Sequence, residues 1–168
     1  MDALEAIYRG EERWTDVIDV KMRRAEVLGE PAERIDELRR VAGLWRDHVG
    51  EPDGARAAYE AILAIHPTHD EAFAELEKLH NAAGRWEPLV ELYLSRLETQ
   101  AEPSAKTQLL RKIARVFEEK LDDKNQALDA LVNALALDFH DRETAGTWSA
   151  WRRPPAAGPK SSRLSTDG

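Results

Sequence analysis

Two histidines have the spacing that comes nearest to a metal site in this sequence. His66 and His69 flank a short turn, and Asp70 follows directly. Imidazole and carboxylate groups are common zinc ligands. However, His66 would end one helix and His69 would begin the next, and an imidazole beside a helix C-terminus is stabilised by the helix dipole. We therefore interpret both as turn residues and expect no metal site and no cofactor.

Candidate catalytic groups are also lacking. Carboxylates are abundant, as in Glu118-Glu119 and Asp122-Asp123, but acidic runs of this kind usually form solvated faces. The sequence has no Gly-rich phosphate loop, no serine nucleophile elbow and no HExxH pattern. The absence of cysteine excludes disulfides, thiolate metal sites and a cysteine nucleophile. We expect a protein that is not an enzyme.

Composition and charge narrow the classes of partner. Apolar residues make up 42% and charged residues 33% of the chain, a balance typical of soluble helical proteins. The net charge is −8, and residues 148–168 hold four basic residues and one acidic residue, so residues 1–147 carry −11. An acidic body repels phosphate backbones, so we expect no nucleic-acid partner. No apolar run is long enough to span a membrane and no signal peptide is visible, so we expect no membrane association and a cytoplasmic location.

The chain aligns with a shifted copy of itself without a gap, with a fixed 72-residue period. The aligned identical pairs include aromatic, charged, proline and small residues: Trp14/Trp86, Arg24/Arg96, Glu30/Glu102, Pro31/Pro103, Leu38/Leu110, Ala42/Ala114, Ala55/Ala127, Ala58/Ala130, Leu63/Leu135 and Glu71/Glu143. A long fixed period indicates a repeat architecture, in which each unit buries its apolar face against its neighbours.

Within each period the apolar residues recur four times at helical spacing. The pattern predicts helices over about 14–28, 32–49, 52–66 and 69–83, with copies one period later, and about eight helices in all. Pro31, Pro52 and Pro103 suit helix starts. Thr68 and Glu71 resemble a capping box, and the glycines at 29, 50 and 84 suit left-handed helix ends.

The residues Gly43, Gly50, Ala55, Tyr59 and Pro67 fall at positions 8, 15, 20, 24 and 32 of a 34-residue unit that starts at residue 36. This pattern resembles the tetratricopeptide repeat (TPR). Further units start at 70 and 108, so 34-residue and 38-residue units alternate and together give the 72-residue period. The resemblance covers about residues 2–147 and implies a right-handed solenoid of stacked antiparallel helix pairs. Leu4-Glu5 and Arg13-Trp14 match residues 76–77 and 85–86, so the array begins inside a repeat.

The resemblance implies that the first helix of each unit lines a concave face that binds a protein or peptide. The polar residues at the corresponding positions are Arg40, Asp47, His48, Lys78, Asn81, Lys112, Glu119 and Lys120. The lysine and asparagine clamp by which chaperone-type members hold a peptide carboxylate is not assembled here. We expect a scaffold for protein–protein interaction. The alternatives are a structural spacer inside a larger signalling protein or enzyme and, with less support, an RNA-binding helical repeat.

Aromatic residues on the apolar stripes, among them Trp14, Trp86 and Tyr93, are interpreted as core. Ala55 and Ala127 would lie where helices approach closely. The last predicted helix lacks a polar capping helix, so an exposed face around Leu131 and Leu135 is expected to favour self-association through the terminal helices.

Residues 148–168 depart from the repeat, because Pro154 and Pro155 fall where a helix should continue. We expect this segment to be disordered after about residue 153. In a GC-rich gene of bacterial type, codons for residues 147–157 can be read in a neighbouring frame as Leu-Glu-Arg-Leu-Ala-Ala-Ala-Thr-Gly-Arg, which resembles residues 76–85. A frameshifted end is therefore the favoured interpretation, and a native disordered tail is the alternative.

Overall fold

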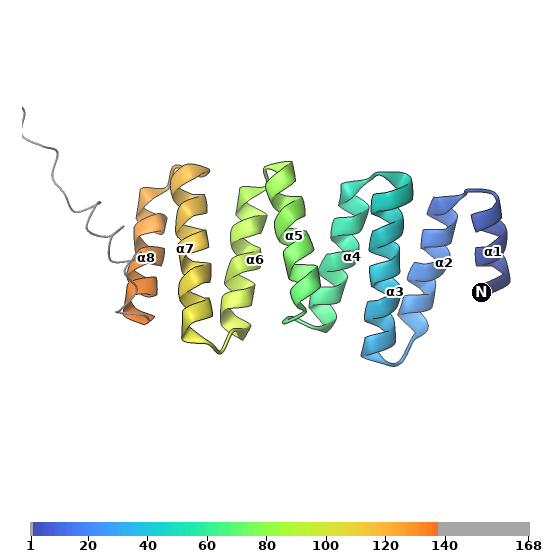
Figure 1. The fold of residues 1–168 in the computed structure, drawn as a ribbon, viewed down its shortest axis with the longest axis horizontal. Coiled ribbons are helices and arrows are strands. Elements are labelled where there is room, and N and C mark those ends of the chain that lie inside the picture. The colour runs from blue at the N-terminus through green and yellow to red at the C-terminus, as the bar shows by residue number, and fades with distance from the viewer. Residues whose placement is uncertain (1, 138–168) are drawn as a thin grey trace, which may run out of the picture.

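The computed structural model describes residues 2–137, and every regular element within that range is helical. The helices lie side by side in a single row, with α1 and α8 at opposite ends (Figure 1). Their bounds are α1 Asp2–Gly10, α2 Trp14–Val27, α3 Pro31–Leu44, η1 Trp45–Val49, α4 Pro52–Ile65, α5 Asp70–Ala83, α6 Trp86–Thr99, α7 Pro103–Glu119 and α8 Lys124–Leu137. The predicted solenoid of antiparallel helices is confirmed. The prediction of a tail at residues 148–168 falls outside the described range.

The repeat period is visible in the helix bounds themselves. Helix α6 begins and ends one full period after α2, and α8 begins one full period after α4. Helices α2, α4, α6 and α8 start at residues 14, 52, 86 and 124, so a longer step and a shorter step alternate along the row. The alternating unit length expected from the sequence is therefore present.

Three helices begin at a proline that follows a glutamate. Pro31, Pro52 and Pro103 each occupy the first turn, and the glutamate before each one has an extended backbone. Proline pushes the preceding residue out of the α region, and its missing N–H costs nothing in the first turn of a helix. These dipeptides therefore set the start of α3, α4 and α7 without a capping side chain.

Some details of the helix ends differ from the sequence-based prediction. The N-cap of α5 is His69, whose Nδ1 accepts a hydrogen bond of 3.2 Å from the Ala72 amide. The prediction of a capping box at Thr68 was wrong. The Thr68 hydroxyl lies 3.3 Å from Nδ1 of His66 and does not cap α5. Gly50 and Gly84 do have the left-handed conformation, with φ of 75° and 65°, whereas Gly29 does not.

The helix predicted over 32–49 is α-helical only to Leu44 and continues as a π-helical turn from Trp45 to Val49. The Trp45 indole lies directly over Gly54 of α4, where a Cβ atom would overlap the ring. The wider turn ends at Gly50, whose amide donates a 2.8 Å hydrogen bond to the Trp45 carbonyl. The close approach of Trp45 to Gly54 thus accompanies the change in helix type.

The core consists of two clusters. The first runs from Val17 to Leu76 and the second from Leu89 to Ala134, with Leu92 packed against both. Ala55 and Ala127 are 3% and 0% exposed, as expected of close helix approaches. Leu131 is only 4% exposed, so the expected exposed face does not include it; Leu135, on the same helix, is half-buried.

Candidate binding groove

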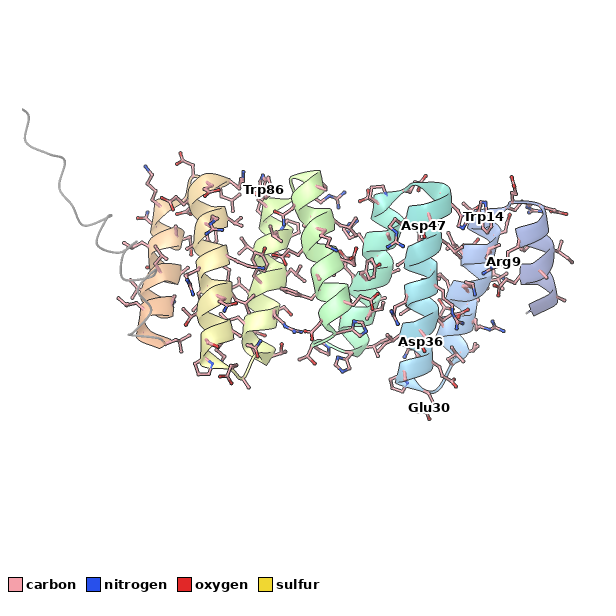
Figure 2. All side chains as sticks on the ribbon, in the orientation of Figure 1. Arg9, Trp14, Glu30, Asp36, Asp47 and Trp86 are labelled. Atoms are coloured by element: carbon pink, nitrogen blue, oxygen red, sulfur yellow. The ribbon has the colours of Figure 1, made fainter. Side chains whose placement is uncertain are left out.

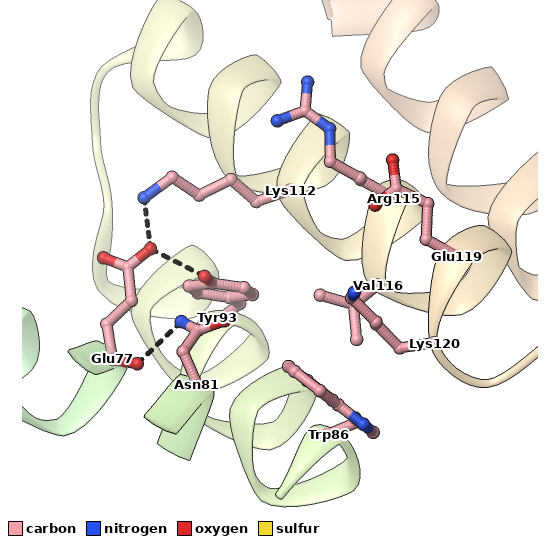
Figure 3. Close-up of a pocket in the computed structure, with 9 residues that line it drawn as sticks. All are labelled: Glu77, Asn81, Trp86, Tyr93, Lys112, Arg115, Val116, Glu119 and Lys120. Atoms are coloured by element: carbon pink, nitrogen blue, oxygen red, sulfur yellow. Dashed lines mark hydrogen bonds and ion pairs between the residues drawn. The ribbon is translucent and has the colours of Figure 1, made fainter. Parts of the chain in front are cut away.

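A groove lies between α5 and α7 with α6 at its base. Its volume is about 250 Å³. Nine residues line it, from α5, α6 and α7 and from the C-cap of α7, Lys120. They are Glu77, Asn81, Trp86, Tyr93, Lys112, Arg115, Val116, Glu119 and Lys120 (Figure 3). We call this set the α5–α7 groove. Helical spacing brings the residues together, since Lys112, Arg115, Val116 and Glu119 fall on one side of α7.

Glu77 is the polar centre of the α5–α7 groove. One of its carboxylate oxygens, Oε1, accepts a hydrogen bond of 2.6 Å from the Tyr93 hydroxyl and lies 2.6 Å from Lys112 Nζ. Its backbone carbonyl accepts a 2.7 Å hydrogen bond from the side-chain amide (Nδ2) of Asn81. Burial raises the pKa of Tyr93 well above its ordinary range, and the bond to Glu77 raises it further. The Tyr93 phenol therefore stays neutral and keeps donating to Glu77.

The other end of the groove combines an aromatic ring with a cation. Lys120 Nζ lies 5.2 Å from the centroid of the Trp86 ring. Lys112 Nζ lies 5.4 Å from the centroid of Tyr93. Cations over aromatic faces are attracted by the ring quadrupole. As predicted, Tyr93 lies in the core and Trp86 packs against it; both rings also border the groove.

Four of the eight predicted partner contacts line this groove: Asn81, Lys112, Glu119 and Lys120. Lys78 pairs with Glu75 of the same helix at 2.6 Å and is 70% exposed. Arg40 lines a neighbouring hollow of about 410 Å³ between α3 and α5, which has Tyr59 at its base. That hollow corresponds to the α5–α7 groove in the preceding repeat unit, since Tyr59 and Tyr93 are 34 residues apart and occupy equivalent positions.

The remaining predicted contacts, Asp47 and His48, lie on the π-helical turn. Asp47 accepts a 2.7 Å hydrogen bond from the Arg46 guanidinium, which lowers the pKa of the carboxyl. The His48 ring stacks on Trp14 with centroids 3.8 Å apart. Trp14 and Asp47 lie near the same edge of the row, as does Trp86 (Figure 2). A role for any of the eight as a partner contact stays a prediction.

The helices α1 to α3 carry a second version of the α5–α7 groove, one period earlier in the chain. Glu5 corresponds to Glu77, and Lys21 corresponds to Tyr93. Lys21 Nζ contacts Glu5 Oε1 at 3.0 Å, as the Tyr93 hydroxyl contacts Glu77. His48 covers Trp14 as Lys120 covers Trp86 in the later copy.

The two versions differ in how far their charges are buried. Lys21 also bonds Glu37 at 3.1 Å, and both side chains are 3% exposed. These charges neutralise one another inside the protein. In the later copy Lys112 and Glu77 are 45% and 24% exposed, so they are accessible to a partner. The α5–α7 groove is therefore the more accessible of the two.

Sequence reasoning placed Val116 on the concave face but passed over Glu77 and Arg115 as groove residues. It favoured core packing for Trp86 and Tyr93, with a binding surface as the lesser alternative. A signal was available for two of them, because Glu77 and Trp86 are retained as Glu5 and Trp14 in the 72-residue alignment. The apolar stripe alone does not reveal that a core aromatic also borders a groove.

The two turn histidines, His66 and His69, do not form a metal cluster with their neighbours in the described range. His66 and His69 stand edge to face with centroids 6.0 Å apart, and within residues 2–137 no cluster of three or more His, Cys, Asp or Glu side chains could hold a metal ion. No helix in the same range is long and apolar enough to cross a membrane.

Comparison with solved structures supports the fold. The N-terminal domain of stress-induced protein-1 (STI-1) from C. elegans matches with a TM-score of 0.56 and 12% sequence identity, over 75% of this chain and 100% of that one. No protein-family model matches the sequence, and no curated protein matches it. At this identity the likeness concerns the fold alone. The chain is thus similar in fold to a helical-repeat domain.

Proposed function

We propose that this chain is a non-catalytic protein-interaction domain and that a peptide segment of a partner protein binds in the α5–α7 groove. The observation that carries this proposal is the convergence of a half-buried tryptophan with partly exposed cationic and anionic side chains, from three helices, on one groove. Interfaces are enriched in Trp, Tyr and Arg, which combine contact area with directed hydrogen bonds. The groove offers each of these types.

The groups in the groove suggest which peptide features would be recognised. The half-buried Trp86 offers apolar surface to a side chain of the peptide, and the buried Val116 forms part of the wall beside it. Arg115 has no ion-pair partner among residues 2–137, so its guanidinium can bind a carboxylate of the peptide. Lys112 is already paired with Glu77 and would contribute less. Therefore a peptide with an apolar residue near an acidic residue fits the groove best.

The proposal can be tested by selecting binders from a random peptide library on the immobilised chain and measuring their affinity by calorimetry. Arg115→Glu should weaken the selected peptides by about tenfold to a hundredfold, because a carboxylate would then face a carboxylate. Lys124→Glu is a matched control, since it makes the same change of charge at an exposed position at the start of α8. Equal loss in both variants would show that only overall charge matters and would refute the groove assignment.

The spacer alternative makes a different prediction in the same experiment. A spacer would yield no peptide with measurable affinity from the library and no partner from a native lysate. An RNA-binding repeat would instead retain nucleic acid from the lysate, with binding that weakens steeply as salt increases. Either result would overturn the proposed function.

A further inference from the structure

The two ends of the helix row carry the two halves of a contact that the protein already makes internally. In the 72-residue alignment α1 corresponds to α5, and α8 corresponds to α4. Helices α4 and α5 pack against each other in the middle of the row (Figure 1). Among the described residues, no helix covers α1 as α4 covers α5, and no helix covers α8 as α5 covers α4.

The contact between α4 and α5 shows which residues form a joint, by which we mean the interface between neighbouring helix pairs. Leu63 of α4 borders a pocket whose other side is formed by Leu76 and His80 of α5 and by Leu92 of α6. Leu76 is 1% exposed there. Leu76 is therefore buried and Leu63 half-buried where the two helix pairs meet.

The same pocket exists on the outer side of α1 with one wall missing. It is lined by Leu4 and Tyr8 of α1 and by Asp16, Asp19, Val20 and Arg23 of α2, and its volume is about 290 Å³. Leu4, Tyr8 and Val20 are the counterparts of Leu76, His80 and Leu92 in the alignment. Leu4 is 49% exposed, in contrast to the buried Leu76. The difference marks the place where an α4-like helix would pack.

Helix α8 has the surface that this place requires. Leu135 corresponds to Leu63, and Leu128 and Val132 replace Arg56 and Glu60, which pair at 2.7 Å on α4. Leu128, Val132 and Leu135 follow one another at helical spacing and form an apolar ridge. Val132 is 42% exposed, and none of the three belongs to the buried core. Thus α8 has exchanged a charged pair for apolar residues on the face that corresponds to the α4 side of the joint.

We propose that copies of this chain associate head to tail, with the α8 ridge of one copy packed into the α1–α2 pocket of the next in the geometry of the internal α4–α5 joint. The interface is heterologous, because the two contributing surfaces differ. Successive copies therefore continue the solenoid. This association is independent of the α5–α7 groove, which lies on other helices.

Sedimentation velocity on the full chain, from micromolar to millimolar concentration, tests the association. The wild type should form a concentration-dependent series of dimers and longer species. Leu4→Glu and Leu135→Glu should each weaken association by at least about a hundredfold, because each would bury an unpaired carboxylate in the joint. Leu94→Glu is the control, since Leu94 is 44% exposed on α6, away from both ends. Circular dichroism should show the same helix content in all variants.

Mixing the variants distinguishes this geometry from others. A chain with Leu4→Glu keeps an intact α8, and a chain with Leu135→Glu keeps an intact α1. Their mixture should therefore form a 1:1 dimer that does not grow further. A symmetric interface would leave one of the single variants dimeric and give no mixed dimer, which would overturn the proposal. A monomeric wild type whose stability falls on Leu135→Glu would also overturn it, because α8 would then be covered within its own chain.

Discussion

The buried charges between α1, α2 and α3 allow a quantitative prediction. Lys21 Nζ lies 3.1 Å from Glu37 Oε1 and 3.0 Å from Glu5 Oε1. Replacing Lys21 with Tyr removes the ammonium and leaves the 3%-exposed Glu37 with Arg40 at 2.9 Å and Arg24 at 3.8 Å. Breaking a buried pair costs about 3–5 kcal/mol. Because Arg40 and Arg24 still neutralise Glu37 in part, we expect Lys21→Tyr to lower the free energy of unfolding by about 3 kcal/mol, the lower end of this range.

The repeat itself supplies the compensating substitution. Lys21 and Glu37 correspond to Tyr93 and Leu109 in the 72-residue alignment, and both of these are buried, at 3% and 7% exposed. Replacing a whole buried ion pair with well-packed residues is often neutral or stabilising. The double variant Lys21→Tyr/Glu37→Leu should therefore lie within about 1 kcal/mol of the wild type, with a coupling energy of about 2 kcal/mol or more.

Urea denaturation followed by circular dichroism measures these differences. A Lys21→Tyr variant as stable as the wild type would refute the inference that Glu37 depends on Lys21. A double variant that loses as much as both single variants together would show that the two copies are not equivalent at these positions.

A pH series provides a second readout for Lys21. Burial would raise the pKa of Glu5, but the hydrogen bond and charge of Lys21, together with Arg9 and Arg24, bring it below 4.5. Because this pKa is lowered on folding, the stability that Glu5 contributes is present above about pH 4.5 and is lost as the pH falls below it. Lys21→Tyr should reduce this loss.

Three further predictions concern packing and pH. Gly54→Ala should destabilise by about 1–3 kcal/mol, because the new methyl overlaps the Trp45 indole; Gly10→Ala, with no neighbour within 4 Å, is the control for a thermal melt. Ala55→Leu should cost about 1–3 kcal/mol by overpacking, and an unchanged melting temperature would mean that the helix register is wrong. Burial lowers the pKa of His80 below 6.5, so urea midpoints should fall as the pH drops below 6.5, and His80→Tyr should abolish that part of the pH dependence.

Much of the fold could be predicted because its determinants are local in the sequence. Apolar spacing and the Glu-Pro dipeptides predicted the helices to within a few residues, and the period predicted which helices are equivalent. The π-helical turn could not be predicted, because it accompanies a contact between Trp45 and Gly54 of the next helix. Thr68 was a plausible cap, but the backbone turns so that His69 takes that position. Such outcomes depend on tertiary geometry that periodicity does not contain.

The candidate groove was less predictable for a related reason. Positions taken from the repeat resemblance identify Asn81, Lys112, Glu119 and Lys120 as neighbours in space. They do not show that Lys112 is paired with Glu77 or that Arg115 has no ion-pair partner among the described residues. Availability for binding depends on which charges are already satisfied, and that follows from contacts between α5, α6 and α7 rather than from any single helix.

Comparison of the two copies suggests how one repeat can serve two purposes. Both copies keep a glutamate and a tryptophan at the corresponding positions 5/77 and 14/86. In the first copy a buried lysine satisfies the glutamate and a second carboxylate, so the charges hold helices together. In the second copy a neutral tyrosine takes the lysine's position and the cation, Lys112, comes from the exposed side of α7. The first copy also has an exposed cation at the position of Lys112, since Arg40 is 63% exposed and bonds Glu37 at 2.9 Å. Exchanging Lys for Tyr at one position thus removes the buried cation and leaves the exposed Lys112 as the cation that pairs with the groove glutamate.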